Sequence, residues 1–426
     1  MLAVDSRSLR YQPSVLDHVE NLEKYQPNGF HPVHLGDKLD QDEKTKEPRY
    51  EVIHKLGSGG FSTVWLASDL INGGYVALKI VAASRSSYGV PPAVESILNS
   101  HPAKIFVTEL RRFAISGPNG RHICQVLPLA GPSLLALSRP PYRLRPEMCK
   151  KLAGEAARAL DFLHSRGLCH GDFTASNLAL AVSPTLHQLS REDLLKILGE
   201  PVRDSVVWAR DPMNTGSAPA YVVEPADLAK LDPTYLSDSL QVLDFDQVFC
   251  FETPLPPGFP PSPGFDLGTP LTSRAPEVFI DGAPGPASDI WALGCTLFRM
   301  RAGMQLFDEW HFGMPSNILA DVFDVVGPPP PKWRKLQFAK NGWPVTSQSP
   351  EAAEDVKTVE FGDEPLDPCE DLQAIVYGIW DDDTERSRPE AAQFVDLLRK
   401  MFAYDVQQRI TAAQILQHPW LGSGQG

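Results

Sequence analysis

Two polar residues five positions apart, Asp172 and Asn177, give the strongest chemical signal in the sequence. They lie in CHGDFTASNLAL at residues 169–180, directly after a predicted amphipathic helix. The carboxylate of Asp172 could orient a hydroxyl group and take its proton, while the side chain of Asn177 could bind a magnesium ion. The spacing therefore indicates chemistry at a hydroxyl group beside a bound metal ion.

A second acidic segment, SLQVLDFDQVF at residues 239–249, is typical of a strand that ends in Asp244. Asp244 could supply a second magnesium ligand, and Phe245 could pack behind it. The same segment could form a strand-end turn without chemistry. Its position after Asp172 and Asn177 favours the metal site.

A glycine-rich turn precedes these acids. LGSGGFSTVW at residues 56–65 places Gly57, Gly59 and Gly60 after an apolar strand, where missing side chains let backbone N–H groups approach phosphate oxygens. The residues that follow are rich in Val, Thr and Trp, so the turn joins two strands, whereas Rossmann and P-loop turns open a helix. Taken alone, the turn could equally be a plain hairpin.

VALK at residues 76–79 predicts a third strand, which ends in Lys79. The ammonium group of Lys79 could bind phosphate oxygens of a nucleotide if a carboxylate holds it in place. Glu95, in PAVESIL, is the candidate for that carboxylate, and Glu109 is an alternative. A solvated surface glutamate is the simpler interpretation of Glu95.

The elements that must position these residues indicate an α+β fold with two lobes. Residues 50–130 are typical of a small β-rich lobe, because apolar residues alternate between Gly and Asn turns. Residues 131–421 carry longer helical patterns and predict a larger helical lobe, with an insertion at about 183–240 that has one short helix near 190–199. Residues 1–49 are interpreted as an N-terminal arm, and residues 422–426 as a tail.

The composition is that of a folded, acidic protein, with 426 residues, 42% hydrophobic residues and a net charge of −14. The acidity argues against direct binding of nucleic acid. Six cysteines are scattered singly without a CxxC pair, which favours a reducing compartment. Because no signal peptide and no run of 18 apolar residues is present, we expect no membrane association and a cytoplasmic or nuclear location.

Three later segments follow in the order RAPEV (274–278), SDIWALG (288–294) and QQRITAAQILQHPWL (407–421). Glu277 and Arg409 predict a buried ion pair, because a bidentate guanidinium group offsets the desolvation of a carboxylate. Asp289 is expected to brace the backbone around Asp172.

Together these segments resemble a eukaryotic protein kinase over roughly residues 50–421. Within that superfamily the sequence resembles the serine/arginine-rich protein kinases, especially their fungal relatives. The phrases that carry this resemblance are YQPNGFHPVHLGD (25–37), LGSGGFSTVWLASD (56–69), ISGPNGRHICQVL (115–127), YVVEPA (221–226) and SDIWALGCTLF (288–298).

The resemblance implies a bilobal kinase fold, ATP and Mg²⁺ as cofactors, and transfer of the ATP γ-phosphate to Ser/Thr hydroxyls. It implies arginine/serine-rich proteins of mRNA splicing as substrates and a monomeric enzyme of the non-specific serine/threonine class. It implies Lys79, Asp172 and Asn177 as catalytic residues and Asn177 and Asp244 as metal ligands. The implied ATP-binding residues, with Leu127 as gatekeeper and residues 128–130 as hinge, are Leu56, Gly57, Ser58, Gly59, Gly60, Phe61, Ser62, Thr63, Val64, Ala77, Lys79, Glu95, Leu127, Leu129 and Ala130.

Three residues depart from the kinase pattern. Gly171 replaces the Arg that often receives an activation-loop phosphate, Thr174 replaces a Lys, and Asp246 replaces the Gly of the DFG motif. The first change, with the rigid PLPPGFPPSP at residues 254–263, predicts activity without phosphorylation of this segment. Thr174, Asp246 and the irregular region around Glu95 keep a pseudokinase, a binding module without turnover, as the alternative.

A small-molecule phosphotransferase of kinase-like fold is a further alternative, which the RAPEV and SDIW segments argue against. The helix predicted within residues 316–331 suggests how a protein substrate docks. In the resembled family the corresponding helix lines an acidic groove for arginine-rich peptides, and Asp324 matches one acidic position, with Asp321 nearby and Asn317 in place of another acid. A solvated helix face is the simpler interpretation.

Overall fold

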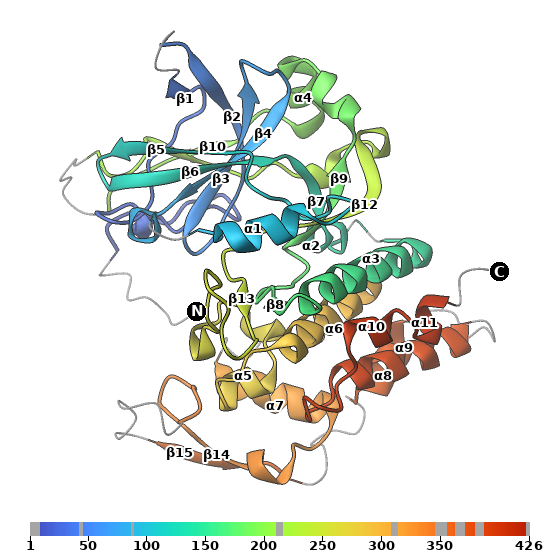
Figure 1. Ribbon diagram of the computed structural model, residues 1–426. Coiled ribbons are helices and arrows are strands. Elements are labelled where there is room, and N and C mark those ends of the chain that lie inside the picture. Colours follow the sequence, from blue (N-terminus) through green and yellow to red (C-terminus); the bar gives the residue numbers. More distant parts are fainter. Residues whose placement is uncertain are drawn as a thin grey trace.

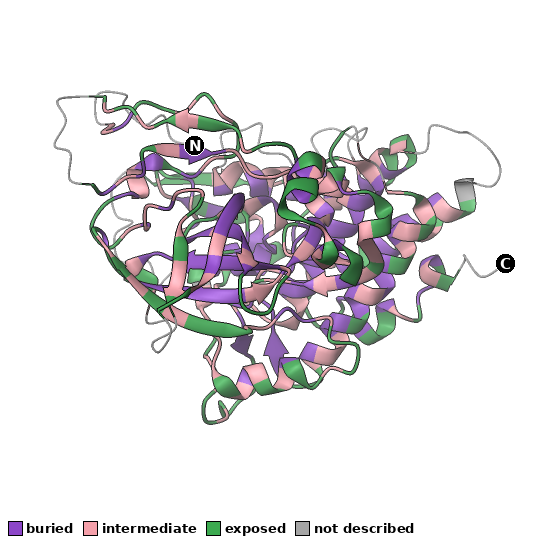
Figure 2. Cartoon of the chain, turned by 90° about the horizontal axis from the view of Figure 1, so that it is seen from above, coloured by how far each residue is buried: buried purple, intermediate pink, exposed green. Residues whose placement is uncertain are grey.

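The computed structural model describes residues 9–41, 46–86, 89–140, 142, 144–209, 216–307, 314–345, 356–362, 371–379 and 387–422, arranged as two lobes (Figure 1). Within these ranges no helix combines the length and apolar character that a bilayer crossing requires. Buried residues line the inner faces of strands and helices, and exposed residues lie on the outside (Figure 2).

The smaller lobe is built on a six-stranded antiparallel sheet in the order β1-β2-β3-β4-β6-β5. Its strands are β1 (Lys38–Gln41), β2 (Pro48–Ser58), β3 (Ser62–Asp69), β4 (Tyr75–Val81), β5 (Arg111–Gly117) and β6 (Gly120–Pro128). Every residue of β4 is buried, as expected for a central strand of β-branched and aromatic residues. Helix α1 (Pro92–Asn99) accompanies this sheet and lies at its lower edge in Figure 1.

The chain leaves β6 at Pro128 and enters β7 (Ala130–Ser133) and α2 (Leu134–Leu137) in the larger lobe. The helices of that lobe are α3 (Pro146–His164), α5 (Pro276–Ile280), α6 (Pro286–Ala302), α7 (Pro315–Val326), α8 (Leu372–Ile379), α9 (Ser387–Met401), α10 (Ala412–Ile415) and α11 (Pro419–Gly422). The predicted inner face of α3 is confirmed, because Leu152, Ala156, Leu160 and Leu163 are all buried. Small strand pairs complete the lobe, β8 (Leu168–Cys169) with β13 (Phe249–Cys250) and β14 (Lys335–Phe338) with β15 (Lys357–Glu360).

The segment between Asn177 and Asp244 begins with β9 (Leu178–Val182) and ends with β12 (Leu236–Val242), which pair with each other. Between them lie α4 (Arg191–Leu198), at the place of the predicted short helix, and the pair β10 (Arg203–Ser205) and β11 (Tyr221–Val223). The segment is better packed than its polar composition suggests, because its buried leucines form a cluster with Leu129.

The interpretation of residues 1–49 as an arm is wrong for their described part. Strand β1 joins the sheet, and Tyr25 and Phe30 are buried in a cluster with Ala82 and Val222. Tyr11 forms an isolated bridge with Trp208, far away in the sequence. Apolar burial against two distant segments therefore fixes this stretch on the small lobe.

A buried ion pair adds to this attachment. Glu20 accepts a hydrogen bond from the ammonium group of Lys55, a β2 residue, and both side chains are almost completely buried. Burial lowers the pKa of Lys55 to about 7. Tyr25 donates a hydrogen bond to the other carboxylate oxygen of Glu20, so the pair is part of a small buried polar network.

Candidate active site

The glycine-rich turn joins β2 to β3, as predicted. Ser58 pairs with Thr63 across the hairpin, and the Gly59 N–H donates to the Ser62 carbonyl at 2.9 Å. A Cβ atom added at Gly57, Gly59 or Gly60 would meet no atom within 4 Å. Open space therefore lies beside the turn, where backbone N–H groups can receive phosphate oxygens.

The tip of the turn is held from outside. The ammonium group of Lys24 donates to the Gly60 carbonyl oxygen and lies 5.5 Å from the centre of the Phe61 ring. The guanidinium group of Arg85 lies 4.2 Å from the same ring, which is 53% exposed. Two cations that lie outside the turn in sequence thus contact its tip.

Most of the predicted nucleotide residues lie on four strands of the small lobe. Leu56, Gly57 and Ser58 end β2, Ser62, Thr63 and Val64 begin β3, Ala77 and Lys79 lie on β4, and Leu127 on β6 is paired with Ala77. Thr63 is buried and accepts a hydrogen bond from the Trp65 indole at 3.0 Å, so its side chain contacts another residue of the same sheet. Leu129 is also buried, in the cluster with Leu186 and Leu194, which leaves only its backbone available to a nucleotide.

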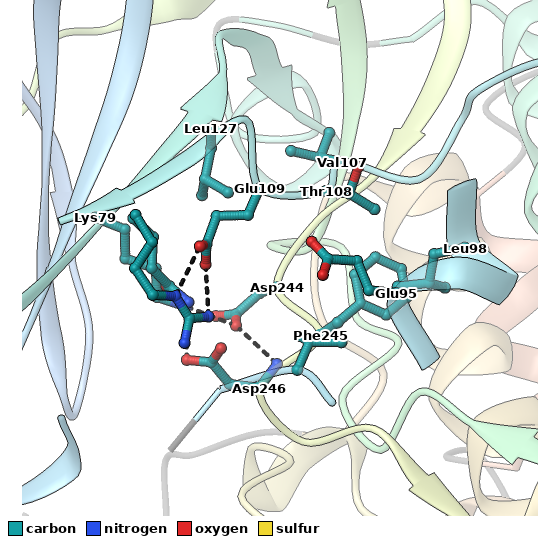
Figure 3. Close-up of a pocket in the computed structure, with 13 residues that line it drawn as sticks. Lys79, Glu95, Leu98, Val107, Thr108, Glu109, Leu127, Asp244, Phe245 and Asp246 are labelled. Atoms are coloured by element: carbon teal, nitrogen blue, oxygen red, sulfur yellow. Dashed lines mark hydrogen bonds and ion pairs between the residues drawn. The ribbon is translucent and has the colours of Figure 1, made fainter. Parts of the chain in front are cut away.

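Lys79 is held by two carboxylates, at 2.8 Å from Asp244 Oδ1 and 2.8 Å from Asp246 Oδ2 (Figure 3). Burial alone would lower the pKa of Lys79, but the two carboxylates outweigh it and raise the pKa above its ordinary value. Burial favours the neutral form of Asp244, yet Lys79 lowers the pKa of Asp244 overall. Both groups are therefore charged at neutral pH.

The expected pair of Lys79 with Glu95 is not formed, and neither is the alternative with Glu109. Glu109 makes a bidentate ion pair with Arg112, with both contacts at 2.7 Å. Glu95 lies across the pocket from Lys79, beside Leu98 (Figure 3). The physical reason is that Val94 and Leu98 bury one side of α1 in the core, which keeps Glu95 on the far wall.

This pocket lies between α1, β4, β6 and the turn from Asp244 to Asp246. Lys79, Glu95 and Leu127 are the expected nucleotide residues that line it. Sequence reasoning missed Gln125, which also lines it and stands opposite Lys79 in the β4–β6 register. Strand pairing is the signal that would have found Gln125, but the partner of β4 is not readable from the sequence.

Asp172 and Asn177 come together as predicted. The Asn177 amide donates to Asp172 Oδ2 at 2.8 Å and to the Asp172 carbonyl oxygen at 2.9 Å. Asp172 Oδ1 is buried and, among the described residues, has no hydrogen-bond partner. Burial, and then the nearby charge of Asp244, raise the pKa of Asp172 to about 7. The carboxylate is thus poised to accept a proton near neutral pH.

The same loop also contacts the Asp244 turn. The Leu243 N–H donates to the Asn177 carbonyl oxygen at 2.8 Å, and the Leu243 carbonyl oxygen lies 3.0 Å from His170 Nε2. These contacts place the two expected metal ligands, Asn177 and Asp244, on adjoining backbone segments. Carboxylate and amide oxygens form a donor set that Mg²⁺ accepts, so the residues present fit this ion.

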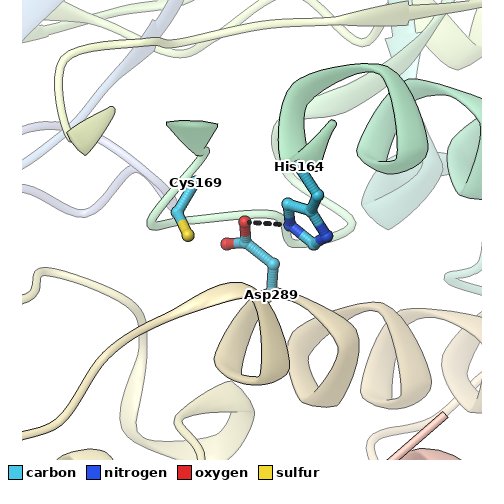
Figure 4. Close-up of side chains that lie close together, drawn as sticks. All are labelled: His164, Cys169 and Asp289. Atoms are coloured by element: carbon cyan, nitrogen blue, oxygen red, sulfur yellow. Dashed lines mark hydrogen bonds and ion pairs between the residues drawn. The ribbon is translucent and has the colours of Figure 1, made fainter. Parts of the chain in front are cut away.

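Asp289 braces this loop from α6, as predicted. Its Oδ2 accepts from the His170 N–H at 2.9 Å and lies 3.0 Å from His164 Nε2, and its Oδ1 accepts from the Gly171 N–H at 3.0 Å. His164, Cys169 and Asp289 lie close enough to hold a metal ion (Figure 4). Because both oxygens of the Asp289 carboxylate already accept hydrogen bonds, we interpret Asp289 as a residue that holds the loop around Asp172 in place.

Gly171 has a structural reason to be glycine. Its φ is +82°, and a Cβ atom there would lie 2.5 Å from the carbonyl oxygen of Gln247. The Gly171 carbonyl oxygen accepts from the Thr269 hydroxyl at 2.5 Å. The segment after Asp244 is therefore hydrogen-bonded to the loop around Asp172 although position 171 has no arginine.

The predicted ion pair of the helical lobe is confirmed. Arg409 contacts the two carboxylate oxygens of Glu277 at 2.7 and 3.0 Å, and both side chains are buried. Arg409 also donates to the carbonyl oxygens of Ala287 and Ala403, both at 2.8 Å. The guanidinium group thus links α5, α6 and the turn before α10.

Comparison with known proteins agrees with this geometry. Residues 267–421 match the protein kinase domain family. The serine/threonine-protein kinase spk-1 of Caenorhabditis elegans is 25% identical over 94% of this chain and 50% of its own length. The serine/threonine-protein kinase SKY1 of Saccharomyces cerevisiae is 33% identical over 38% of this chain and 23% of its own length. SRSF protein kinase 3 of Homo sapiens is 32% identical over 38% of this chain and 30% of its own length.

The chain thus spans half or less of the length of these relatives. A crystal structure of a kinase domain matches with a TM-score of 0.57 over 92% of this chain and 98% of that one, at 18% identity. At this identity the likeness shows the fold alone, which is the bilobal protein kinase fold that the sequence predicted.

Proposed function

We propose that this chain, which contains a protein kinase domain with SR protein kinase relatives, is an ATP- and magnesium-dependent serine/threonine protein kinase of the non-specific class. The observation that carries the proposal is a chain of contacts: Lys79 contacts Asp244, Asn177 contacts Asp172, and the Leu243 N–H beside Asp244 donates to the Asn177 carbonyl oxygen.

Each residue has a role in the proposed reaction. ATP supplies the phosphoryl group when bound, and Asn177 and Asp244 would hold its magnesium ions. Lys79 and the backbone N–H groups of the glycine turn bind phosphate oxygens. Asp172 orients the substrate hydroxyl and accepts its proton, and its Oδ1 forms no hydrogen bond with a residue that the structure describes.

We also propose that the substrates are arginine/serine-rich proteins of mRNA splicing. The support is the similarity to SR protein kinases and the net charge of −14, which suits a basic substrate. We further propose that this acidic enzyme is a monomer in the cytoplasm or nucleus and that it binds neither nucleic acid nor membranes directly. The five cysteines of the described residues are buried and form no disulfide with one another, which supports a reducing compartment.

The test is incubation of the purified protein with labelled ATP, magnesium and an Arg-Ser repeat peptide beside a basic control protein. Single replacements of Lys79, Asp172 and Asp244 should remove nearly all phosphate transfer. If the wild type and Asp172→Asn transfer phosphate at the same background rate while both bind ATP, the chain is a pseudokinase. Transfer to the control protein alone would retain the kinase and reject the arginine/serine-rich substrate.

A further inference from the structure

Lys79 lies between two carboxylates of one short turn. Its side chain is only 8% exposed, whereas those of Asp244 and Asp246 are 42% and 41% exposed and open to the cleft. The two acids are two residues apart, and Asp244 has a φ of +60°. A buried ammonium group needs a counter-charge, so the loss of both contacts would leave Lys79 unstable in its charged form.

We propose that Asp246 is the positioning residue of Lys79 when a nucleotide is bound, in place of a glutamate of α1. This inference rests on the proposed kinase function, in which Asp244 serves as a magnesium ligand. Once the Asp244 carboxylate is engaged with the metal ion, its hold on Lys79 weakens. Asp246 then remains as the carboxylate already at 2.8 Å from the ammonium group.

The other carboxylates near the pocket are unsuited to this role. Glu109 has both oxygens on Arg112, at 2.7 Å each. Glu95 forms no ion pair with any of the described Lys, Arg or His residues. It faces the pocket from the wall opposite Lys79 (Figure 3). To reach Lys79, Glu95 would have to cross the pocket together with α1, whose Val94 and Leu98 are fully buried in the core.

The replacement of Gly by Asp in the turn therefore has a function. The residue that holds Lys79 belongs to the same turn as the metal ligand Asp244, and the Asp246 N–H faces Asp244 Oδ1 at 3.4 Å. Lys79 and the metal site are thereby positioned by one segment of the chain. The position of α1 then has little influence on whether the site is assembled.

Binding of a fluorescent ATP analogue with magnesium, together with steady-state kinetics, tests this inference. Asp246→Asn should weaken nucleotide binding and lower kcat/KM for ATP about tenfold, as expected for the loss of a charged hydrogen bond. Asp246→Glu should restore part of the loss. Glu95→Gln should have a clearly smaller effect, below about threefold, because it removes no contact of Lys79. Asp238→Asn, at a 72% exposed side chain, serves as the surface control.

A double-mutant cycle shows whether Asp246 acts through Lys79. In a Lys79→Gln background, Asp246→Asn should have no further effect on nucleotide binding. An equal loss in both backgrounds would overturn the inference, and so would a larger effect of Glu95→Gln than of Asp246→Asn. Because the cycle uses binding, it decides the role of Asp246 even if the wild type binds ATP and transfers no phosphate, an outcome that would refute only the proposed function.

Discussion

The ammonium group of Lys24 donates a hydrogen bond to the carbonyl oxygen of Gly60. A residue from the segment that precedes the kinase lobes therefore holds the tip of the glycine-rich turn. The same turn is also contacted at Phe61, whose ring lies 4.2 Å from the Arg85 guanidinium group and whose carbonyl oxygen accepts from the Ala82 N–H at 2.8 Å. We therefore expect binding of the proposed nucleotide to depend on a part of the chain outside the kinase motifs.

Replacement of Lys24 by Met is expected to raise KM for ATP several-fold and to change kcat less. The variant loses an exposed hydrogen bond to the Gly60 carbonyl oxygen and a contact with the Phe61 ring. Steady-state kinetics at varied ATP measures this. Lys24→Arg should keep most of the contact, and Lys230→Met removes an exposed lysine elsewhere as a control. An equal KM in Lys24→Met and wild type would show that the contact is not needed.

The rate of phosphate transfer is expected to rise with pH through about pH 7. Burial raises the pKa of Asp172 to about 7, and only its ionised form accepts a proton. The profile of kcat against pH, measured between about pH 5.5 and 8.5, checks this. A profile that is flat across this range would contradict the assignment of Asp172 as the base.

The same carboxyl affects stability in the opposite direction. Because the pKa of Asp172 is raised in the folded protein, folding disfavours its ionised form, and stability is lost as the pH rises towards 7. Asp172→Asn removes this charge. We therefore expect the variant to gain thermal stability relative to wild type more at pH 8 than at pH 5, and an equal gain at both would argue against a raised pKa.

Breaking the buried Glu277–Arg409 pair is expected to cost much of the stability of the helical lobe. Arg409→Met leaves a buried carboxylate without its partner, which typically costs about 3–5 kcal/mol. Denaturant unfolding of the variant and the wild type measures this loss of unfolding free energy. The matched control is Arg191→Met, which breaks a more exposed ion pair with Glu51 and should cost about 0–1 kcal/mol. Similar losses in the two variants would mean that the buried pair contributes little.

Activity is expected not to require phosphorylation of the segment after Asp244. An arginine cannot replace Gly171 in this backbone conformation, and Thr269 already ties the segment to the loop. Phosphatase treatment should leave the rate of phosphate transfer unchanged, whereas Thr269→Val should lower it. A large drop after phosphatase treatment would show that a phosphate is part of the active site's assembly.

Docking of an arginine-rich substrate is expected to use Asp321 and Asp324 of α7. The two acids are partly exposed and three residues apart on one face, while Val322 and Val325 are buried. Asp321→Lys with Asp324→Lys should raise KM for the peptide several-fold, leave KM for ATP unchanged and reduce the salt dependence of binding.

The matched control for docking is the double change Glu192→Lys with Asp193→Lys on α4, which also reverses two exposed acidic charges. It should leave KM for the peptide near the wild-type value. An unchanged KM in the α7 variant, or an equal rise in the α4 variant, would place docking elsewhere.

The contact between Asp172 and Asn177 was predicted well because it lies within a short segment, whereas the predicted Glu277–Arg409 pair joins residues far apart in the sequence. Asp172 and Asn177 contact each other inside one loop, so their spacing was sufficient. The partner of Lys79 could not be predicted from spacing, because it depends on the position of α1 relative to the turn at Asp246. The residue types around Glu95 do not indicate the distance between Glu95 and Lys79.

The attachment of residues 9–41 was missed for a related reason. Their apolar residues follow no helical or strand period, and their partners are distant in the sequence. Asn119 shows this most clearly, since its side-chain amide donates to the carbonyl oxygens of Phe30 and Ser217, both at 2.6 Å. One buried side chain thus joins three separate stretches of the chain.

The Glu20–Lys55 pair sets a limit on how this protein can be divided. A fragment that begins at Tyr50 would retain every motif of the kinase site, yet it would carry Lys55 in β2 without its counter-ion. It would also uncover the apolar surface that Tyr25 and Phe30 occupy. We therefore expect the smallest unit that folds by itself to begin before Glu20 and to be larger than the region of kinase resemblance.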